Sequence, residues 1–297
     1  MAGHTGAGFA LCDFGSARVH YGVSHQNPPN IFSRYGVAHT TPPPDLAGTR
    51  ADPSRAPLVD GLDLYGECRP ARDAGGDFFE FAPLHPAGLS VSVGDLSGEG
   101  AGGAIVMSGL KAMLRALTRH GSYEIGRLVR ELNHAVWLTA PDDFSATLFC
   151  AYLDPVLGEL QYVNAGHEPA LLIRRRTGRV HHLESTGTLL GLSNRVIHGQ
   201  RTVPLEPGDL LIVYTDGVVD ARNAAGAEFR ETGILRVLEE FREVRASDLT
   251  REILDAVERH SGRERQSDDR TVVVARFKGS AALTETAAAE ELALAAA

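Results

Sequence analysis

The 297-residue chain contains only three cysteines, Cys12, Cys68 and Cys150. An odd, widely spaced set cannot form a disulfide framework, and no two of them have the spacing of zinc ligands. A reducing compartment is therefore favoured. The chain also lacks any apolar run close to the ~20 residues that span a bilayer, and its first residues lack the basic and apolar segments of a secretory signal. We therefore expect a cytoplasmic protein that does not enter a membrane.

Positive charge is scarce as well. The chain has 29 Lys and Arg against 38 Asp and Glu, which gives a formal net charge of -9. General binding to nucleic acid or to an anionic membrane needs a basic face, so neither is expected as a partner. The densest basic run is Arg-Arg-Arg at 174–176, which we interpret as an exposed strand end or turn because such short runs are usually solvated.

The patterning of the sequence divides the chain into three parts. Residues 1–57 are rich in Gly, Pro, His and Asn without a helical or strand period, so they are predicted to be a poorly ordered extension. A short docking segment is the alternative there. Residues 58–278 have dense apolar patterning and are predicted to form one domain. Residues 279–297 are rich in Ala and Glu and are predicted to be a frayed or disordered tail.

Within the central domain, apolar periods separate strands from helices. Strands are predicted at 62–68, 78–82, 89–93, 147–153, 160–164, 170–173, 180–183, 197–203, 210–214 and 271–277. Helices are predicted at 103–120, from Ser122 as N-cap to about 138, at 234–241, and at 248–260 with Ser247 as N-cap. Strands that alternate with helix pairs favour two packed sheets with helices outside them.

Four aspartates stand where an extended apolar run gives way to a turn or helix: Asp77, Asp95, Asp216 and Asp268. Each alone has an ordinary interpretation, because aspartate is common in turns. Gathered carboxylates are costly unless a cation lies between them, and Asp77 and Asp95 flank a predicted hairpin that would bring them together. Hard oxygen ligands beside glycines suit Mg²⁺ or Mn²⁺ better than zinc. The set therefore predicts a two-ion site of the kind that handles phosphate.

Five segments resemble the metal-dependent protein phosphatase (PPM) family, and most closely its bacterial SpoIIE-like branch. In the family's order they are Gly-Gly-Asp-Phe-Phe at 75–79, Gly-Asp-Leu-Ser-Gly-Glu-Gly at 94–100, Tyr-Val-Asn-Ala-Gly-His at 162–167, Tyr-Thr-Asp-Gly at 214–217 and Asp-Asp-Arg-Thr-Val at 268–272. The resemblance implies an α+β fold, a four-layer α-β-β-α sandwich of two mainly antiparallel sheets flanked by helix pairs. It also implies two Mn²⁺ or Mg²⁺ ions and hydrolysis of phosphoserine or phosphothreonine without a phosphoenzyme, by a water activated between the ions.

The same resemblance implies roles for individual residues. Asp95 would bridge both ions, and the carbonyl of Leu96 would be a neighbouring ligand. Asp77 would bind the second ion directly or through water. Asp216 and Asp268 would complete the first ion's ligands.

Four further residues have open assignments. Asp269 is the less expected ligand of its pair, because the family's ligand is the first residue of that motif. Arg72 is spaced like the phosphate-gripping arginine of better-known relatives, and a guanidinium binds phosphate bidentately. Glu99 replaces the histidine of many relatives, so it can orient a water at the site or be a solvated loop residue. His167 looks like a proton donor, but a packed or hydrogen-bonded histidine is favoured.

We therefore predict a cytoplasmic bacterial serine/threonine phosphatase in signal transduction. The resemblance implies a phosphorylated STAS-type anti-sigma-factor antagonist as substrate, and hence sigma factor regulation. Residues 1–57 are too short and irregular for a sensor domain, so an activating partner in trans or a homodimer is expected, acting on the helix pair near 103–138. Two alternatives stay open: a pseudophosphatase that binds a phosphoprotein as a scaffold, and a small-molecule phosphomonoesterase.

Overall fold

The protein is described from a computed structural model. The residues that the structure describes are 57–71, 75–84, 88–97, 100–119, 124–140, 144–241, 243–262 and 266–279. For residues 100–105 and 119 only the backbone is described. All described residues belong to one of the two units into which the chain divides, Arg50–Ala297. The predicted extension before residue 57, the tail after 279, Arg72, Glu99 and the predicted cap Ser122 lie outside the described residues.

Two five-stranded sheets form the centre of the domain, and every strand pair is antiparallel. Sheet A has the order β1 (Leu62–Arg69), β10 (Arg270–Phe277), β9 (Leu210–Tyr214), β6 (Ala170–Ile173) and β7 (Val180–Leu183). Sheet B has the order β2 (Asp77–Leu84), β3 (Gly88–Ser97), β4 (Ser145–Asp154), β5 (Glu159–Ala165) and β8 (Arg201–Pro204).

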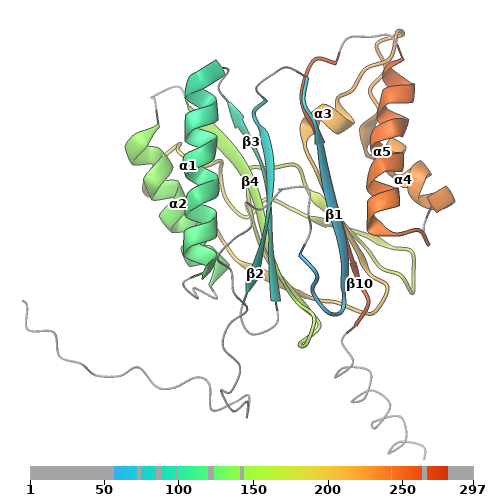
Figure 1. Ribbon diagram of the computed structural model, residues 1–297, viewed down its shortest axis with the longest axis horizontal. Coiled ribbons are helices and arrows are strands. Elements are labelled where there is room, and N and C mark those ends of the chain that lie inside the picture. Colours follow the sequence, from blue (N-terminus) through green and yellow to red (C-terminus); the bar gives the residue numbers. More distant parts are fainter. Residues whose placement is uncertain are drawn as a thin grey trace, which may run out of the picture. The chain divides into compact units, whose positions relative to one another are not determined.

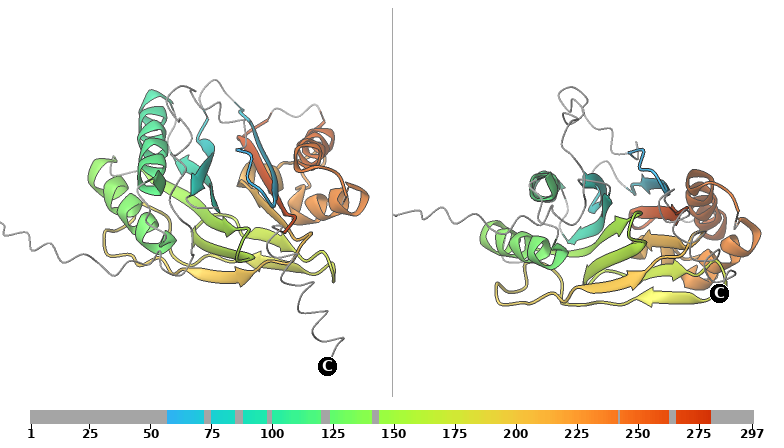
Figure 2. Two further views of the ribbon diagram at one scale, coloured as in Figure 1. Left: turned by 60° about the horizontal axis from the view of Figure 1, so that its bottom comes forward. Right: turned by 90° about the horizontal axis from the view of Figure 1, so that it is seen from below.

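Helices cover the outer faces of both sheets (Figure 1). On sheet B lie α1 (Gly100–Arg119) and α2 (Ile125–Thr139), and on sheet A lie α4 (Arg230–Phe241) and α5 (Ala246–Ser261). The short α3 (Asp216–Val219) follows β9. Figure 2 shows the two sheets between the helix pairs. The predicted four-layer sandwich is therefore confirmed.

Three apolar layers hold these elements together, and the alternation of side chains along each strand explains them. In β2, Phe79 points into the layer between the sheets, whereas its neighbour Phe78 points toward α1 and α2. The layer under α4 and α5 is filled by residues such as Ile253 and Val274. Burial of each such side chain contributes roughly 1.5–3 kcal/mol to the free energy of folding, so these layers supply most of the favourable free energy.

Three sequence predictions about elements are wrong. The N-cap of α2 is Glu124 rather than Ser122, and it makes no side-chain capping bond. The strand predicted at 197–203 covers only Arg201–Pro204. The N-cap of α5 is Arg245 rather than Ser247, and it makes no side-chain capping bond. Instead, the amide of Ala246 donates to Asp63 Oδ2 at 3.2 Å, so a contact from β1 satisfies one amide of the first turn. Separately, no helix among the described ranges has the length and apolar character that a membrane span requires.

Candidate metal centre

Asp77 and Asp95 occupy facing positions in the β2–β3 ladder, so the predicted hairpin does bring them together. The pairing continues just beyond them, where the amide of Leu96 donates to the carbonyl of Gly76 at 3.1 Å. On its other side, Asp95 faces Thr147 of β4. The strand ends of sheet B therefore fix the backbone positions of two carboxylates at one edge.

The Leu96 carbonyl and the Asp95 carboxylate face the same point beside Gly76. A methyl group added to Gly76 would lie 2.6 Å from the Leu96 carbonyl oxygen and 2.8 Å from Asp95 Oδ1. Only glycine leaves this space open, which is the reason that the backbone can approach so closely here. The two oxygens named as ligands from the sequence are thus neighbours in the structure.

Asp216 and Asp268 reach the same region from sheet A. Asp216 begins α3 directly after β9, and Asp268 stands two residues before β10, which pairs with β9. Burial raises the pKa of Asp95 to about 6, and the nearby charges of Asp216, Asp268 and Asp269 add to this rise. Burial and the charge of Asp268 likewise raise the pKa of Asp216. These interactions between charges indicate that carboxylates next to both sheets lie near one another.

Asp77 is the most deeply buried of the four, with 8% of its surface exposed. Its Oδ2 accepts hydrogen bonds from the hydroxyls of Thr215 and Thr271, both at 2.7 Å. Burial raises its pKa to about 8, the two hydroxyls oppose the rise, and the charges of Asp95 and Asp269 add to it. A carboxylate in this position is costly when ionised and favours a nearby cation.

Asp269 uses its carboxylate to hold the backbone that precedes β2. Its Oδ1 accepts the amide of Ala71 at 2.8 Å, and its Oδ2 accepts the amide of Asp77 at 3.2 Å. The sequence analysis missed this anchoring contact, and it missed the two threonines that bind Asp77. The only signal for them was their place inside the motifs at 214–217 and 268–272.

His167 is buried next to Thr147. Its Nδ1 lies 2.9 Å from the Thr147 hydroxyl, and its amide donates to Asn164 Oδ1 at 2.8 Å. Burial lowers the pKa of the imidazole to about 4, which the backbone of Tyr214 partly offsets. A ring that stays neutral and enclosed at neutral pH is a packed, hydrogen-bonded histidine, the interpretation that the sequence favoured over a proton donor.

The donor set suits hard divalent cations. The four predicted ligand side chains are all carboxylates, and the Leu96 carbonyl adds a backbone oxygen, which are ligand types of Mg²⁺ and Mn²⁺. Within the described ranges, no three acidic, histidine or cysteine side chains are close enough to enclose an ion by themselves. The donor types therefore fit Mn²⁺ or Mg²⁺, with ligands beyond these side chains needed to complete the coordination.

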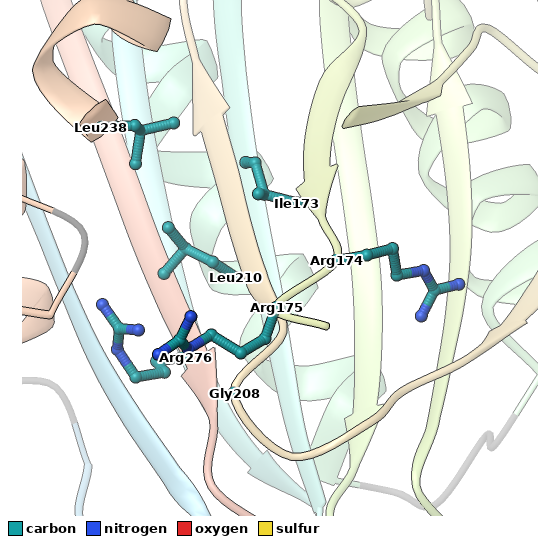
Figure 3. Close-up of a pocket in the computed structure, with 7 residues that line it drawn as sticks. All are labelled: Ile173, Arg174, Arg175, Gly208, Leu210, Leu238 and Arg276. Carbon is teal, nitrogen blue, oxygen red and sulfur yellow. The ribbon is translucent and has the colours of Figure 1, made fainter. Parts of the chain in front are cut away.

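The basic run at 174–176 is a turn after β6, as predicted, and it does not join this site. Arg174 pairs with buried Asp209 at 2.6 Å, Arg175 with Glu243 at 2.6 Å, and Arg176 with Glu206 at 3.4 Å. In Figure 3, Arg174 and Arg175 border a hollow of about 20 Å³ together with Arg276. A hollow of this size holds about one water molecule, so it cannot accept a phosphorylated side chain.

Comparison with known proteins places this geometry among its relatives. The model of the family described as Stage II sporulation protein E (SpoIIE) matches residues 85–278. The phosphoserine phosphatase RsbU of Bacillus subtilis is 25% identical over 225 residues, which cover 76% of this chain and 66% of RsbU. This chain thus spans just under two thirds of that relative's length.

Solved structures show the same fold. The RsbU and RsbW domains of Rv1364c from Mycobacterium tuberculosis match with a TM-score of 0.61 and 26% identity, over 75% of this chain and 63% of that one. The catalytic domain of the serine/threonine phosphatase PstP, in complex with two manganese ions, matches with a TM-score of 0.54 and 17% identity, over 72% and 98%. The latter likeness shows the fold alone. Since the family model matches most of the described domain, the chain belongs to the SpoIIE family of PPM-type proteins.

Proposed function

We propose that this protein is a metal-dependent phosphatase that removes phosphate from phosphoserine or phosphothreonine on a regulatory protein. One observation carries the proposal: Asp77 and Asp95 face each other where β2 begins and β3 ends, and the charges of Asp216 and Asp268, which stand next to β9 and β10, add to the rise in the pKa of Asp95 that burial causes. The relative RsbU is named a phosphoserine phosphatase, which supports the same reaction here.

Two Mn²⁺ or Mg²⁺ ions are the proposed cofactors, and PstP with its two manganese ions supports this number. Asp95 and the Leu96 carbonyl, which share one space, would hold ions together with Asp77, Asp216 and Asp268. Bound ions of this kind supply Lewis-acid activation of water and neutralise charge on a phosphoryl group. Arg72 remains a proposed phosphate-binding residue, and Asp269 remains the less expected ligand.

The protein's own residues orient the proposed ligands and leave part of the acidic edge exposed to a substrate. Asp77 is buried and oriented by hydroxyls, whereas Asp268 is exposed, so the acidic edge runs from the interior of the domain to its surface. A phosphate carried on a protein surface can reach such an edge without entering a closed cavity. This access supports a phosphoprotein as substrate.

The proposed substrate is a phosphorylated STAS-type antagonist of an anti-sigma factor, and the proposed setting is the bacterial cytoplasm. The similarity to RsbU and to the RsbU and RsbW domains of Rv1364c supports this choice. An activating partner in trans or a homodimer would regulate the enzyme through α1 and α2.

The activity can be tested by phosphate release from a phosphoserine peptide with Mn²⁺, with Mg²⁺ and with a chelator. We expect release with either metal and none with the chelator. The same reaction with p-nitrophenyl phosphate and competing peptide tests the substrate class, since a protein phosphatase should prefer the peptide. Tight peptide binding without release would indicate a pseudophosphatase, and preference for small metabolites would indicate a phosphomonoesterase; either result contradicts the proposal.

The substrate can be tested separately with phosphorylated STAS-domain proteins encoded by the same genome. We expect at least one to be dephosphorylated with a kcat/KM well above that of a phosphopeptide copied from its own phosphorylation site. Equal rates on the folded protein and on its peptide would contradict recognition of a STAS domain.

A further inference from the structure

Two threonine hydroxyls from sheet A bind a single carboxylate oxygen of sheet B. Thr215 lies between β9 and α3, and Thr271 lies in β10. The hydroxyls of both donate to Oδ2 of Asp77 in β2 at 2.7 Å. We propose that Thr215 and Thr271 are positioning residues that hold the Asp77 carboxylate in its metal-binding orientation. This inference rests on the proposed function, because it takes Asp77 to be a metal ligand.

The geometry of the pair leaves the hydroxyls little freedom. Thr215 and Thr271 have no exposed surface, and Asp77 is 8% exposed. The amide of Thr271 donates to Thr215 Oγ1 at 3.0 Å, so the hydroxyl proton of Thr215 is left to point at Asp77. The amide of Thr215 donates in turn to the Thr271 carbonyl at 3.1 Å. The two threonines thus fix each other's positions by hydrogen bonds of their own, in addition to those that they donate to the carboxylate.

The two hydrogen bonds use the same oxygen of the Asp77 carboxylate and leave the other oxygen for a cation. Among the described residues, the hydrogen-bond donors to the Asp77 side chain both bind Oδ2. Two donors occupy the acceptor positions of one carboxylate oxygen, so Oδ1 keeps its lone pairs for another partner. The amide of Asp77 is also held, by Asp269 Oδ2 at 3.2 Å, which fixes the backbone below the side chain. Asp77 is therefore oriented at both its backbone and its side chain.

Groups that hydrogen-bond a metal ligand fix its orientation, and their loss typically weakens metal affinity by about 10–100-fold. A purely structural role is the competing explanation, because the same bonds also join the two sheets. The two roles differ in what they predict. A structural bond affects unfolding, whereas a positioning bond also affects the affinity for the metal, and it depends on the hydroxyl rather than on the shape of the side chain.

The test is Mn²⁺ binding to the metal-stripped full-length protein, measured by titration calorimetry. The variants are Thr215→Val, Thr271→Val and their combination, which remove the hydroxyls but keep the side-chain volume, and Thr215→Ser and Thr271→Ser, which keep the hydroxyls. Thr250→Val is the matched control, since Thr250 is fully buried and its hydroxyl donates to the carbonyl of Ala246 within α5. Asp77→Asn identifies the binding step that depends on Asp77.

We expect each Val variant to weaken the Asp77-dependent Mn²⁺ step by about 10-fold and the pair by up to about 100-fold. The Ser variants should bind within about 2-fold of wild type, and Thr250→Val should lower the melting temperature without changing affinity. If the doubly substituted protein does not fold, the two single variants decide the question. Val variants that bind Mn²⁺ like wild type, or Ser variants as weak as Val, would overturn the inference.

The same titration separates this inference from the proposed function. A folded wild-type protein that binds no Mn²⁺ would overturn the proposed function and the inference together. Wild-type binding that is lost in Asp77→Asn but unchanged in the Val variants would leave the proposed function standing and overturn the role of the threonines alone.

Discussion

Asp77, a proposed metal ligand, destabilises the metal-free fold when its carboxyl group is ionised. It is buried, its pKa is raised to about 8, and burial is the main cause. A folded-state pKa above the ordinary value means that folding favours the protonated acid. The metal-free protein should therefore be most stable, as far as this group is concerned, below about pH 4, and should lose that stability as the pH rises to about 8.

Asp77→Asn should remove this dependence, because an amide does not ionise. At pH 8 and without metal, we expect the variant to be more stable than wild type by on the order of a few kcal/mol, as measured by urea unfolding. Added Mn²⁺ should stabilise wild type more than the variant, which lacks a proposed ligand of the second ion. Asp209→Asn is the control, because Asp209 is buried but paired with Arg174, so its loss should destabilise. Equal stabilities at pH 8 for wild type and Asp77→Asn would contradict this view.

His167 is expected to have the opposite pH dependence. Its pKa in the folded protein, about 4, lies below the ordinary value of 6.5, so folding favours the neutral ring. Stability from this group is complete above pH 6.5 and is lost as the pH falls through 4, by up to about 3 kcal/mol.

Substitution of His167 isolates this contribution. In His167→Asn the side-chain oxygen can replace Nδ1 as the partner of Thr147, so the loss between pH 6.5 and 4 should be absent. Exposed His181→Asn should keep the wild-type slope. Urea unfolding across this pH range measures the difference, and parallel curves for wild type and His167→Asn would show that the ring titrates normally.

At the scale of elements, a bidentate ion pair ties α1 to the strand that begins with Asp77. Arg115 donates to both oxygens of Glu80 in β2, at 2.6 and 2.9 Å, and only 7% of Glu80 is exposed. Removing the guanidinium leaves a buried carboxylate without its partner, which is more costly than the loss of a surface ion pair.

We expect Arg115→Met to lower the free energy of unfolding by about 1–3 kcal/mol, as measured by chemical denaturation. Arg130→Met in α2 is the control, because Arg130 is exposed and should contribute within about 0.5 kcal/mol. If both variants were equally stable, the pair would not hold α1 on the sheet.

Elements with clear local signals were predictable from the sequence. Strands β6, β7 and β9 match their predicted ranges, because turn residues bound each of these short segments. The start of α5 was not predictable, since Asp63, 183 positions away, supplies the contact to Ala246. The same holds at the candidate site: motif order predicts the aspartates as ligands, but Thr215 and Thr271 reach Asp77 across 138 and 194 positions. A local sequence pattern does not indicate which residues of two different sheets will be in contact.

For the whole molecule, the three apolar layers lie between Val59 and Phe277. The predicted domain, residues 58–278, therefore contains every core residue that the structure describes. We expect a fragment of these residues to unfold in one cooperative transition, with a melting temperature within roughly 3 °C of the full chain. Scanning calorimetry of both proteins measures this, and a fragment without a cooperative transition would show that residues beyond these bounds complete the core.

If carboxylates from the two sheets form a catalytic metal site, the proposed bridging ligand Asp95 should be essential for phosphate release. The most direct measurement is Mn²⁺-dependent phosphate release from a phosphoserine peptide by wild type, Asp95→Asn and Asp154→Asn. Asp154 caps the β4–β5 turn away from the site, so its substitution controls for the loss of one carboxylate. We expect kcat/KM to fall by at least about 1000-fold for Asp95→Asn, beyond the ~1–3 kcal/mol of an ordinary hydrogen bond, and we expect near-normal release by Asp154→Asn. Near-normal release by Asp95→Asn, or none from folded, Mn²⁺-loaded wild type, would contradict the proposed catalytic metal site.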